Sequence, residues 1–213
     1  MESSWIDVSV DLEPGMVTYE GDLPYEEYEF KTHERDGVHI MRVLMETHTG
    51  THVDAPYHMI PNGKKISEFD LDRFMGKALV VEVHGDEIGE DAIPPSCPRV
   101  VLFKTKNSYL YDRFHGDYAY LTLGAARKLV EHKVKVVGID YLSVERFGSA
   151  GFDVHKELMS NDVAIVEGLN LAQAKPGIHD FVCLPLKMGQ DGAPCRAAIS
   201  RGTESDGGLA QQH

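Results

Sequence analysis

The stretch TLGAARKLVEHKVKVVGI, residues 122–139, joins a helical pattern to a buried-strand pattern and decides the fold class. Thr122 has the side chain of a helix N-cap, and Ala126 and Leu129 follow at the spacing of one helix face. Residues 134–139 then have the near-continuous apolar character of a strand that is buried on both faces. A helix that leads directly into such a strand is typical of an α/β fold.

Other segments extend this pattern along the chain. Runs of the same apolar kind occupy residues 78–83, 100–104, 163–166 and 181–186. A shorter helix is expected over residues 154–159, while the first third of the chain, with an alternating stretch at 38–45, has the character of strands and loops. We therefore predict an α/β fold: a single domain over residues 1–201 with a mixed β-sheet and flanking helices. The order of the strands stays open.

The composition favours a small-molecule partner over a nucleic acid or an anionic membrane. The 213 residues can bury one sizeable core, and a formal net charge of -13 would be repelled by phosphate groups. No apolar run reaches the roughly 20 residues of a membrane span, and the start lacks the features of a secretion signal, so a cytoplasmic protein is expected. The polar residues 202–213 are predicted to be a flexible tail.

The residues that carry chemistry fall within one short segment, ETHTGTHVDAPYH, residues 46–58. Its histidines and its aspartate are His48, His52, Asp54 and His58. Glycine, proline and β-branched residues between them oppose a helix. In an extended chain, side chains at even positions project to one side until the proline turns the backbone. The segment therefore predicts a cluster of imidazole and carboxylate groups on one face.

Such a cluster is a candidate metal site. Imidazole and carboxylate together are the ligand set of zinc or manganese, whereas cages made only of oxygen suit calcium or magnesium. Glu167 follows the apolar run at 163–166, and a carboxylate at the end of a buried strand needs a partner such as a cation. The alternative is a set of unrelated surface histidines, which the spacing disfavours. Three dispersed cysteines without a CxxC motif predict reduced thiols.

Residues 48–58, HTGTHVDAPYH, resemble the HxGTHxDxPxH signature of the cyclase family of metal-dependent hydrolases, which includes kynurenine formamidases (arylformamidases) and isatin hydrolases. The resemblance covers nearly the whole chain. It continues in order through Gly138-Ile139-Asp140, Ser143-Val144, the pair His155 and Glu167, Leu184-Pro185-Leu186, and Gly192-Ala193-Pro194-Cys195-Arg196. It implies the swivelling β/β/α-like fold of that family.

The resemblance also implies a site for two divalent metal ions, with zinc expected before manganese. The implied roles are Asp54 as the bridge between the ions, His48 and His52 on one side, His155 and Glu167 on the other, and His58 as the catalytic acid/base. His58 could instead be a third metal ligand or hold a ligand in place, because ligation and proton transfer use the same ring nitrogens. A homodimer or homotetramer is implied as well.

The implied reaction is the hydrolysis of N-formyl-L-kynurenine to L-kynurenine and formate by metal-activated water, in tryptophan breakdown. Formamidases of this type usually carry an aromatic-Pro-Gly-Asp stretch near the start. Residues 19–24 are YEGDLP and lack the first proline, so the substrate pocket can differ. Two alternatives stay open: a lactam or lactone hydrolase similar to isatin hydrolase, and a non-catalytic metal-binding relative.

Other polar residues are predicted to lie outside the site. Asp140 follows a strand and is interpreted as a cap of the next turn. The remaining histidines have no comparable partners nearby and are predicted to be ordinary surface or loop residues: His33, His39, His84, His115, His132 and His179. Trp5, the only tryptophan, is predicted to anchor the core, with a place in the pocket wall of a neighbouring subunit as the alternative.

Overall fold

The computed structural model describes residues 4–201, so the predicted tail at 202–213 lies outside the described residues. One large sheet contains the strands β1 (Trp5–Asp7), β4 (His52–Asp54), β5 (Met75–Glu82), β7 (Val100–Lys104), β9 (Val136–Ile139), β10 (Ala164–Glu167), β11 (Gly177–Pro185) and β12 (Gly192–Ser200). Each of the five predicted apolar runs forms one of these strands, with the predicted bounds for β7 and shifted bounds for the others. The predicted α/β fold with a mixed sheet is confirmed.

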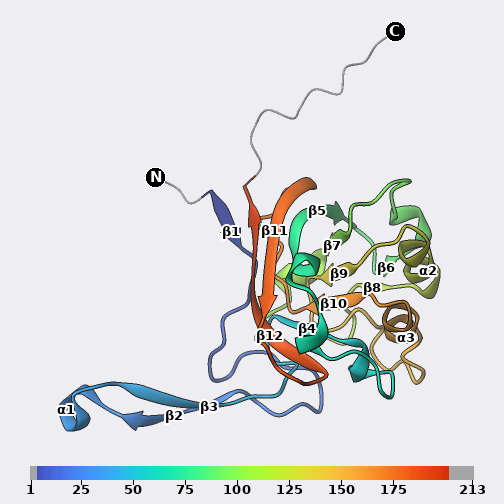
Figure 1. Cartoon of the computed structure of the whole chain (residues 1–213). Helices are drawn as coiled ribbons and strands as arrows, with labels where there is room; N and C mark the ends of the chain where they lie inside the picture. The colour runs from blue at the N-terminus through green and yellow to red at the C-terminus, as the bar shows by residue number, and fades with distance from the viewer. Residues whose placement is uncertain (1–3, 202–213) are drawn as a thin grey trace.

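The sheet has eight strands in the order β1-β12-β11-β5-β7-β9-β10-β4. Strands β5, β7, β9 and β10 run parallel to one another, and the other pairings are antiparallel. Because β4 also pairs with β12, the sheet curls into a barrel-like ring with β1 at its edge (Figure 1). This closure brings β4 between β10 and β12.

Helices α2 (Leu123–Glu131) and α3 (Asp153–Ser160) lie together on one side of the sheet (Figure 1). The predicted N-cap of α2 is confirmed, because the hydroxyl of Thr122 accepts a hydrogen bond from the backbone N–H of Ala125. Short elements complete the chain: α1 (His33–Asp36), η1 (Pro56–His58), η2 (Ile66–Glu68), η3 (Leu71–Phe74), η4 (Glu90–Ala92), η5 (Lys106–Tyr109), and the paired strands β2 (Glu26–Lys31) with β3 (Ile40–Leu44) and β6 (Glu87–Ile88) with β8 (Tyr120–Leu121).

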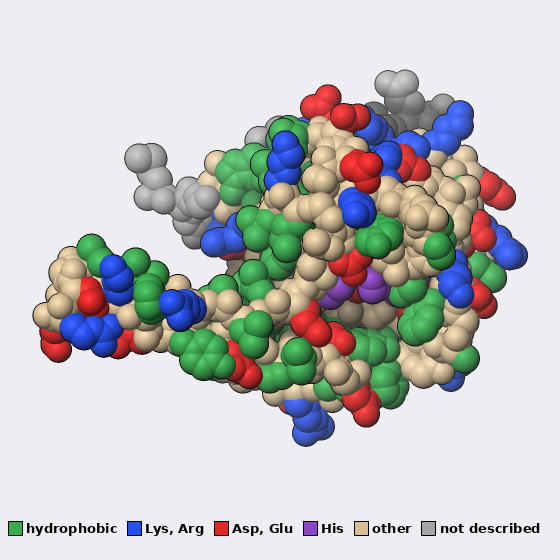
Figure 2. All heavy atoms as spheres, turned by 60° about the horizontal axis from the view of Figure 1, so that its bottom comes forward, with side chains coloured by type: hydrophobic (Ala, Val, Ile, Leu, Met, Phe, Trp, Pro, Cys, Tyr) green, Lys and Arg blue, Asp and Glu red, His purple; other side chains and the backbone are tan. Residues whose placement is uncertain are grey.

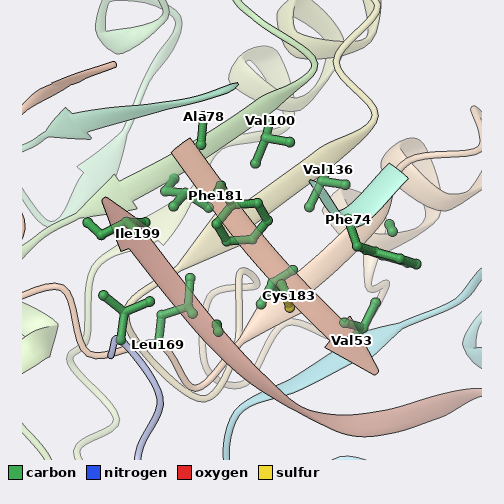
Figure 3. Packing of buried hydrophobic residues seen from close by; sticks show 14 of the residues in the cluster. Val53, Phe74, Ala78, Val100, Val136, Leu169, Phe181, Cys183 and Ile199 are labelled. Carbon is green, nitrogen blue, oxygen red and sulfur yellow. The ribbon is translucent and has the colours of Figure 1, made fainter. Parts of the chain in front are cut away.

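The parallel strands are buried on both faces, which explains their near-continuous apolar runs. On β7, Val100 and Leu102 belong to a cluster with β11 and β12, whereas Val101 and Phe103 belong to a second cluster with the helices. Figure 3 shows Phe181 of β11 within the first cluster, which is enclosed by the curled sheet. The two cores fix the sheet between them and thereby hold the ends of β4 and β10 in place.

Strands β2 and β3 with α1 form an arm, residues 26–44, that projects from the rest of the molecule (Figure 1). The alternating pattern at 38–45 predicts a strand with one buried face. The strand forms, but all five residues of β3 are exposed. The pattern therefore predicts the strand correctly, but no element in the described part of this chain packs against the arm to bury one of its faces.

Two predictions about single residues are wrong. Trp5 is 40% exposed on the edge strand β1 and is not the core anchor that was predicted. His179 is not a surface residue but is buried in β11. Its two ring nitrogens lie 2.7 and 2.8 Å from the backbone carbonyl oxygens of Ser200 and Lys175, which satisfy the buried ring. The cysteines are free thiols, as predicted.

No helix in residues 4–201 has the length and apolar character that crossing a membrane requires.

Candidate metal centre

Strand β4 carries His52 and Asp54 on the same side of the sheet, as the extended-chain prediction requires. In the register of the sheet, Glu167 of β10 lies opposite His52, and Gly192 of β12 lies opposite Asp54. His52 Nε2 is 3.2 Å from Asp54 Oδ1 and 3.6 Å from Glu167 Oε2. Strand pairing thus brings together residues that are more than a hundred positions apart in the sequence.

His48 reaches the same place from a turn and not from the predicted extended chain. Gly50, with φ of 65°, bends the backbone between His48 and β4. His48 Nδ1 lies 2.7 Å from Asp54 Oδ1 as a result. The predicted alternation of faces therefore holds only within β4, where the backbone is a strand.

His155 enters the centre from the first turn of α3, where it is buried. Its Nε2 lies 3.3 Å from Glu167 Oε1, and its Nδ1 lies 3.0 Å from Glu145 Oε2. Glu145 is buried too, and it also accepts hydrogen bonds from the backbone N–H groups of Val154 and His155. The Glu145 carboxylate therefore fixes the start of α3 and the orientation of the His155 ring together.

His58 ends the short helix η1 and lines the same pocket. The centres of the His58 and His48 rings are 4.1 Å apart, and the His58 and His155 ring centres are 6.3 Å apart. Its Nδ1 lies 3.3 Å from Oδ2 of Asp191. All six residues predicted for the site, from three separate regions of the chain, thus converge in the structure.

Two carboxylates of this cluster, Glu145 and Asp191, were not predicted. Glu145 contacts Nδ1 of His155, and Asp191 contacts Nδ1 of His58 and Nε2 of His48. The only signal in the sequence is position: Glu145 directly follows Ser143-Val144, and Asp191 directly precedes the segment at 192–196. Both segments belong to the family pattern, but neither acidic residue has a spacing that identifies its partner.

Unpaired buried atoms indicate that a cation belongs here. Among the described residues, the buried side-chain atoms without a hydrogen-bond partner include His52 Nε2 and Asp54 Oδ2. His52 Nδ1 lies 2.9 Å from the carbonyl oxygen of Gly50, so it carries the ring proton and donates it, and Nε2 presents its lone pair. Two acceptors that are buried without a donor are costly in the absence of a cation.

The ligand atoms form two overlapping groups, and the atoms within each group lie within 4.8 Å of one another. One group is His48, Asp54 and His58, and the other is His52, Asp54 and Glu167. Asp54 belongs to both, which is the arrangement that a bridging carboxylate requires. The division differs from the predicted one, because His48 and His52 fall in different groups and His155 falls in neither. The first group contains His58, so the structure keeps open the alternative that this histidine is a ligand.

The ionisable side chains of the centre strongly shift one another's pKa values. Burial lowers the pKa of His48, but the Asp54 and Asp191 carboxylates outweigh it and raise the pKa to about 10. Burial of His155 is likewise outweighed by Glu145 and Glu167, and its pKa is also raised to about 10. Despite burial, His48 and His52 hold the pKa of Asp54 well below its ordinary value. Carboxylates that stabilise positive charge on the neighbouring imidazoles this strongly are suited to a divalent cation.

The site opens into a pocket of about 340 Å³, a size suited to a small molecule. Its apolar wall includes Val17, Leu142 and Phe152, and the segment that departs from the formamidase pattern contributes Tyr19 and Asp22. Figure 2 shows histidine side chains recessed near the middle of one face of the molecule. Two residues of this segment that keep the pattern thus line the pocket, whereas Glu20, which replaces the proline, is not among the lining residues.

Asp140 is outside the centre, as predicted. Its carboxylate is buried and accepts hydrogen bonds from the hydroxyls of Thr105 and Ser108, at 2.8 and 2.6 Å. The backbone N–H groups of the same two residues also donate to it. With four donors, Asp140 fixes the loop after β7 and has no free lone pair directed at the metal centre.

Comparison with known proteins places this geometry in a family. The family model described as "Putative cyclase" matches residues 6–146. A kynurenine formamidase of Bacillus cytotoxicus is 31% identical over 92% of this chain and 97% of its own length. That of Erythrobacter litoralis is 33% identical over 91% of this chain and 92% of its own.

Comparison with solved structures leads to the same family. A "potential metal-dependent hydrolase with cyclase activity" is 33% identical, with a TM-score of 0.82 over 93% of this chain and 98% of that one. Isatin hydrolase A of Labrenzia aggregata, at 20% identity, has the same fold, with a TM-score of 0.78 over 92% of each chain. As the sequence predicts, the chain belongs to the cyclase family of metal-dependent hydrolases.

Proposed function

We propose that this protein is an arylformamidase, which hydrolyses N-formyl-L-kynurenine to L-kynurenine and formate. The observation that carries the proposal is the pair of unpaired buried atoms, His52 Nε2 and Asp54 Oδ2, together with a pocket of about 340 Å³ that His52 lines. These atoms need a cation, and the pocket leaves room for a small amide beside it. Relatives at 31% and 33% identity that cover nearly the whole chain are kynurenine formamidases.

The residues of the centre fit two divalent ions, and we propose zinc before manganese. Mixed imidazole and carboxylate ligands suit both metals, and Asp54 belongs to both groups of ligand atoms. The residues that would hold the ions are His48, His52, Asp54, His155 and Glu167. Bound divalent ions supply two effects here: they lower the pKa of a water molecule and polarise the substrate carbonyl.

Proton transfer is assigned to His58. An amide nitrogen leaves poorly unless it is protonated, so the reaction needs an acid next to the scissile bond. His58 lines the pocket and is only partly buried, whereas His52 and His155 are almost fully enclosed. Val17, Leu142 and Phe152 would exclude bulk water from the other side of the substrate.

A second candidate substrate is a neutral cyclic amide such as isatin. The pocket-lining residues within the described chain include no lysine or arginine, although they include Asp22 and Glu46. The α-carboxylate of formyl-kynurenine would therefore find no lysine or arginine in this pocket, whereas a neutral lactam needs none. This observation favours the lactam alternative on electrostatic grounds.

Parallel assays distinguish the candidates. With zinc-loaded protein, kcat/KM is expected to be higher for N-formyl-L-kynurenine than for isatin, and His58→Ala should lower kcat by about 10²- to 10⁴-fold while zinc stays bound. The reverse order of kcat/KM would replace the formamidase proposal with the lactam hydrolase. Bound zinc without turnover of either substrate, or of a simple lactone, would identify a non-catalytic relative. Loss of zinc in His58→Ala would make His58 a ligand.

The arm supports the predicted homo-oligomer. Its exposed apolar side chains include Tyr28, Phe30, Ile40 and Val43, and a two-stranded hairpin by itself is marginally stable in water. We propose that a second copy of this chain covers the arm in a homodimer, or in a tetramer built from such dimers. A cytoplasmic location stays a prediction from the sequence.

A further inference from the structure

One carboxylate connects the proposed acid/base histidine to the set of metal ligands. Asp191 Oδ2 lies 2.9 Å from Nε2 of His48 and 3.3 Å from Nδ1 of His58. The hydroxyl of Thr47 donates to the other oxygen of this carboxylate at 3.1 Å. Asp191 thus contacts two imidazoles and a hydroxyl at the wall of the pocket, and it belongs to neither group of candidate ligand atoms.

The backbone holds Asp191 in this position. Asp191 directly precedes β12, and its carbonyl oxygen accepts a hydrogen bond of 2.8 Å from the backbone N–H of Ala55, which directly follows β4. At the next residue, Gly192, a Cβ atom would lie 2.8 Å from Cε1 of His48. The glycine therefore lets the His48 ring lie against β12, where the Asp191 carboxylate can reach it.

We propose that Asp191 is a positioning residue that sets the orientation and the tautomer of His58 for proton transfer, in addition to holding His48. The proposal rests on the acid/base role that the proposed function gives to His58. A carboxylate that accepts from Nδ1–H keeps a proton on that nitrogen. Nε2 is then the ring nitrogen that exchanges protons with the substrate.

The path of the proton in the reaction explains why a fixed tautomer of His58 is useful. Water adds its hydroxyl to the carbonyl carbon, and its proton passes to Nε2 of His58. The C–N bond then breaks, its electron pair goes to nitrogen, and the proton on Nε2 moves to that nitrogen. Throughout both steps, Nδ1–H stays bonded to Asp191, which stabilises the imidazolium that forms in between.

A nuclear magnetic resonance experiment tests the positioning without using activity. In zinc-loaded protein with ¹⁵N-labelled histidine, the ring signals that disappear in His58→Ala belong to His58. These signals should show the proton on Nδ1 in the original protein and a changed proton distribution in Asp191→Asn. Asp180→Asn is the matched control, because Asp180 lies on β11 and pairs with Lys77 at the surface. Unchanged His58 signals in Asp191→Asn would overturn the proposal.

Steady-state kinetics tests whether the position of His58 affects the rate of hydrolysis. At saturating zinc, Asp191→Asn should lower kcat by about 10- to 100-fold with little change in KM, the usual effect of losing a partner that orients a functional group. Combined with His58→Ala, it should cause no further loss, since both changes remove the same function. A loss that is seen only at limiting zinc and vanishes at saturating zinc, or that persists in the His58→Ala background, would show that Asp191 does not act through His58 and would overturn the proposal.

The two experiments also separate this inference from the proposed function. If the protein hydrolyses none of the substrates but the His58 ring signals change in Asp191→Asn, the proposed function fails and the positioning role stands. If turnover is found but neither the ring signals nor kcat respond to Asp191→Asn, the positioning role fails and the proposed function stands.

Discussion

The Glu145 carboxylate determines how His155 faces the rest of the centre. It contacts Nδ1 of the ring at 3.0 Å, so Nε2 is directed toward Glu167. The same oxygen, Oε2, also accepts hydrogen bonds from two backbone N–H groups at the start of α3, and Oε1 accepts one from the hydroxyl of Ser149. A histidine ligand that is oriented by a carboxylate binds metal more tightly than one that is free to rotate.

Replacing this carboxylate tests its contribution. Glu145→Gln keeps the shape but removes the charge that stabilises His155, so zinc affinity should fall by about 10- to 100-fold. Competition with a chromogenic chelator measures the affinity. Glu131→Gln, an exposed position at the end of α2, provides the control. Equal zinc affinity in Glu145→Gln and the original protein would contradict this role of Glu145.

The metal-free protein should lose stability as the pH rises. The pKa values of His48 and His155 are raised from 6.5 to about 10, so the stabilisation from their protonated rings is fully present below 6.5 and is lost as the pH passes through about 10. Urea unfolding of chelator-treated protein across this range measures the loss, and His48→Gln should reduce it. A free energy of unfolding that stays constant over this range would contradict the coupling described here.

The same residues show what spacing can predict. His48, His52, Asp54 and His58 lie close together in the chain, so any compact local structure brings them together. His155 came only from the family pattern, and Glu167 came from that pattern and from its place at the end of a buried apolar run; both converge on the centre in the structure. Glu145 and Asp191 were missed because their partners depend on where α3 begins and where β12 pairs, which are set by tertiary structure.

Among the elements, β4 and β12 were the hardest to predict. Strand β4 is three residues long, and it exists because β10 and β12 pair with its two edges. Strand β12 has small and polar residues where the predicted strands have valine and isoleucine, so no apolar run marks it. The parallel strands were predicted because helices and the inner core bury both of their faces, and this burial leaves a signal in the sequence.

The turn that carries His48 packs against the end of β10 through two glycines. Gly168 has φ of 69°, and a Cβ on it would collide with the carbonyl oxygen of Gly50. Gly168→Ala should therefore lower both the free energy of unfolding and the zinc affinity, because the turn must move away from Glu167.

Gly148→Ala separates the two causes of this loss. Gly148 has a similar φ of 76°, but nothing lies within 4 Å of its added Cβ. It should cost only the backbone strain of about 1–2 kcal/mol, without affecting zinc binding. Urea unfolding and zinc titration measure both quantities. If the two variants lose equal stability and keep equal zinc affinity, the close approach of the Gly50 carbonyl has no consequence.

For the whole molecule, the fold class and the family were predicted, because the apolar runs and the family pattern extend along almost the entire chain. The exposure of the arm on both faces was not predicted. Its strands alternate as a half-buried hairpin does, but sequence patterning cannot tell whether the covering surface belongs to the same chain or to another one. The structure shows that the described part of the same chain does not cover it.

A charge on the arm should therefore shift the oligomeric state. Val43 is 51% exposed on β3, and in the proposed dimer Val43→Lys would bury an unpaired charge, which weakens association. Light scattering coupled to size-exclusion chromatography should show dimers or tetramers for the original protein and more monomer for this variant. Tyr109→Lys changes a side chain that is 70% exposed outside the arm and should have no effect. A monomeric original protein would contradict the proposed assembly.

The most direct test of the metal centre is the metal content of the protein, determined by mass spectrometry after purification without chelator and again after equilibration with zinc. Asp54→Asn, which removes the carboxylate shared by both ligand groups, serves as the comparison. About two ions per chain are expected in the original protein, as in other two-metal sites. The variant should bind markedly less. An original protein that contains no metal and takes up neither zinc nor manganese would contradict the metal centre.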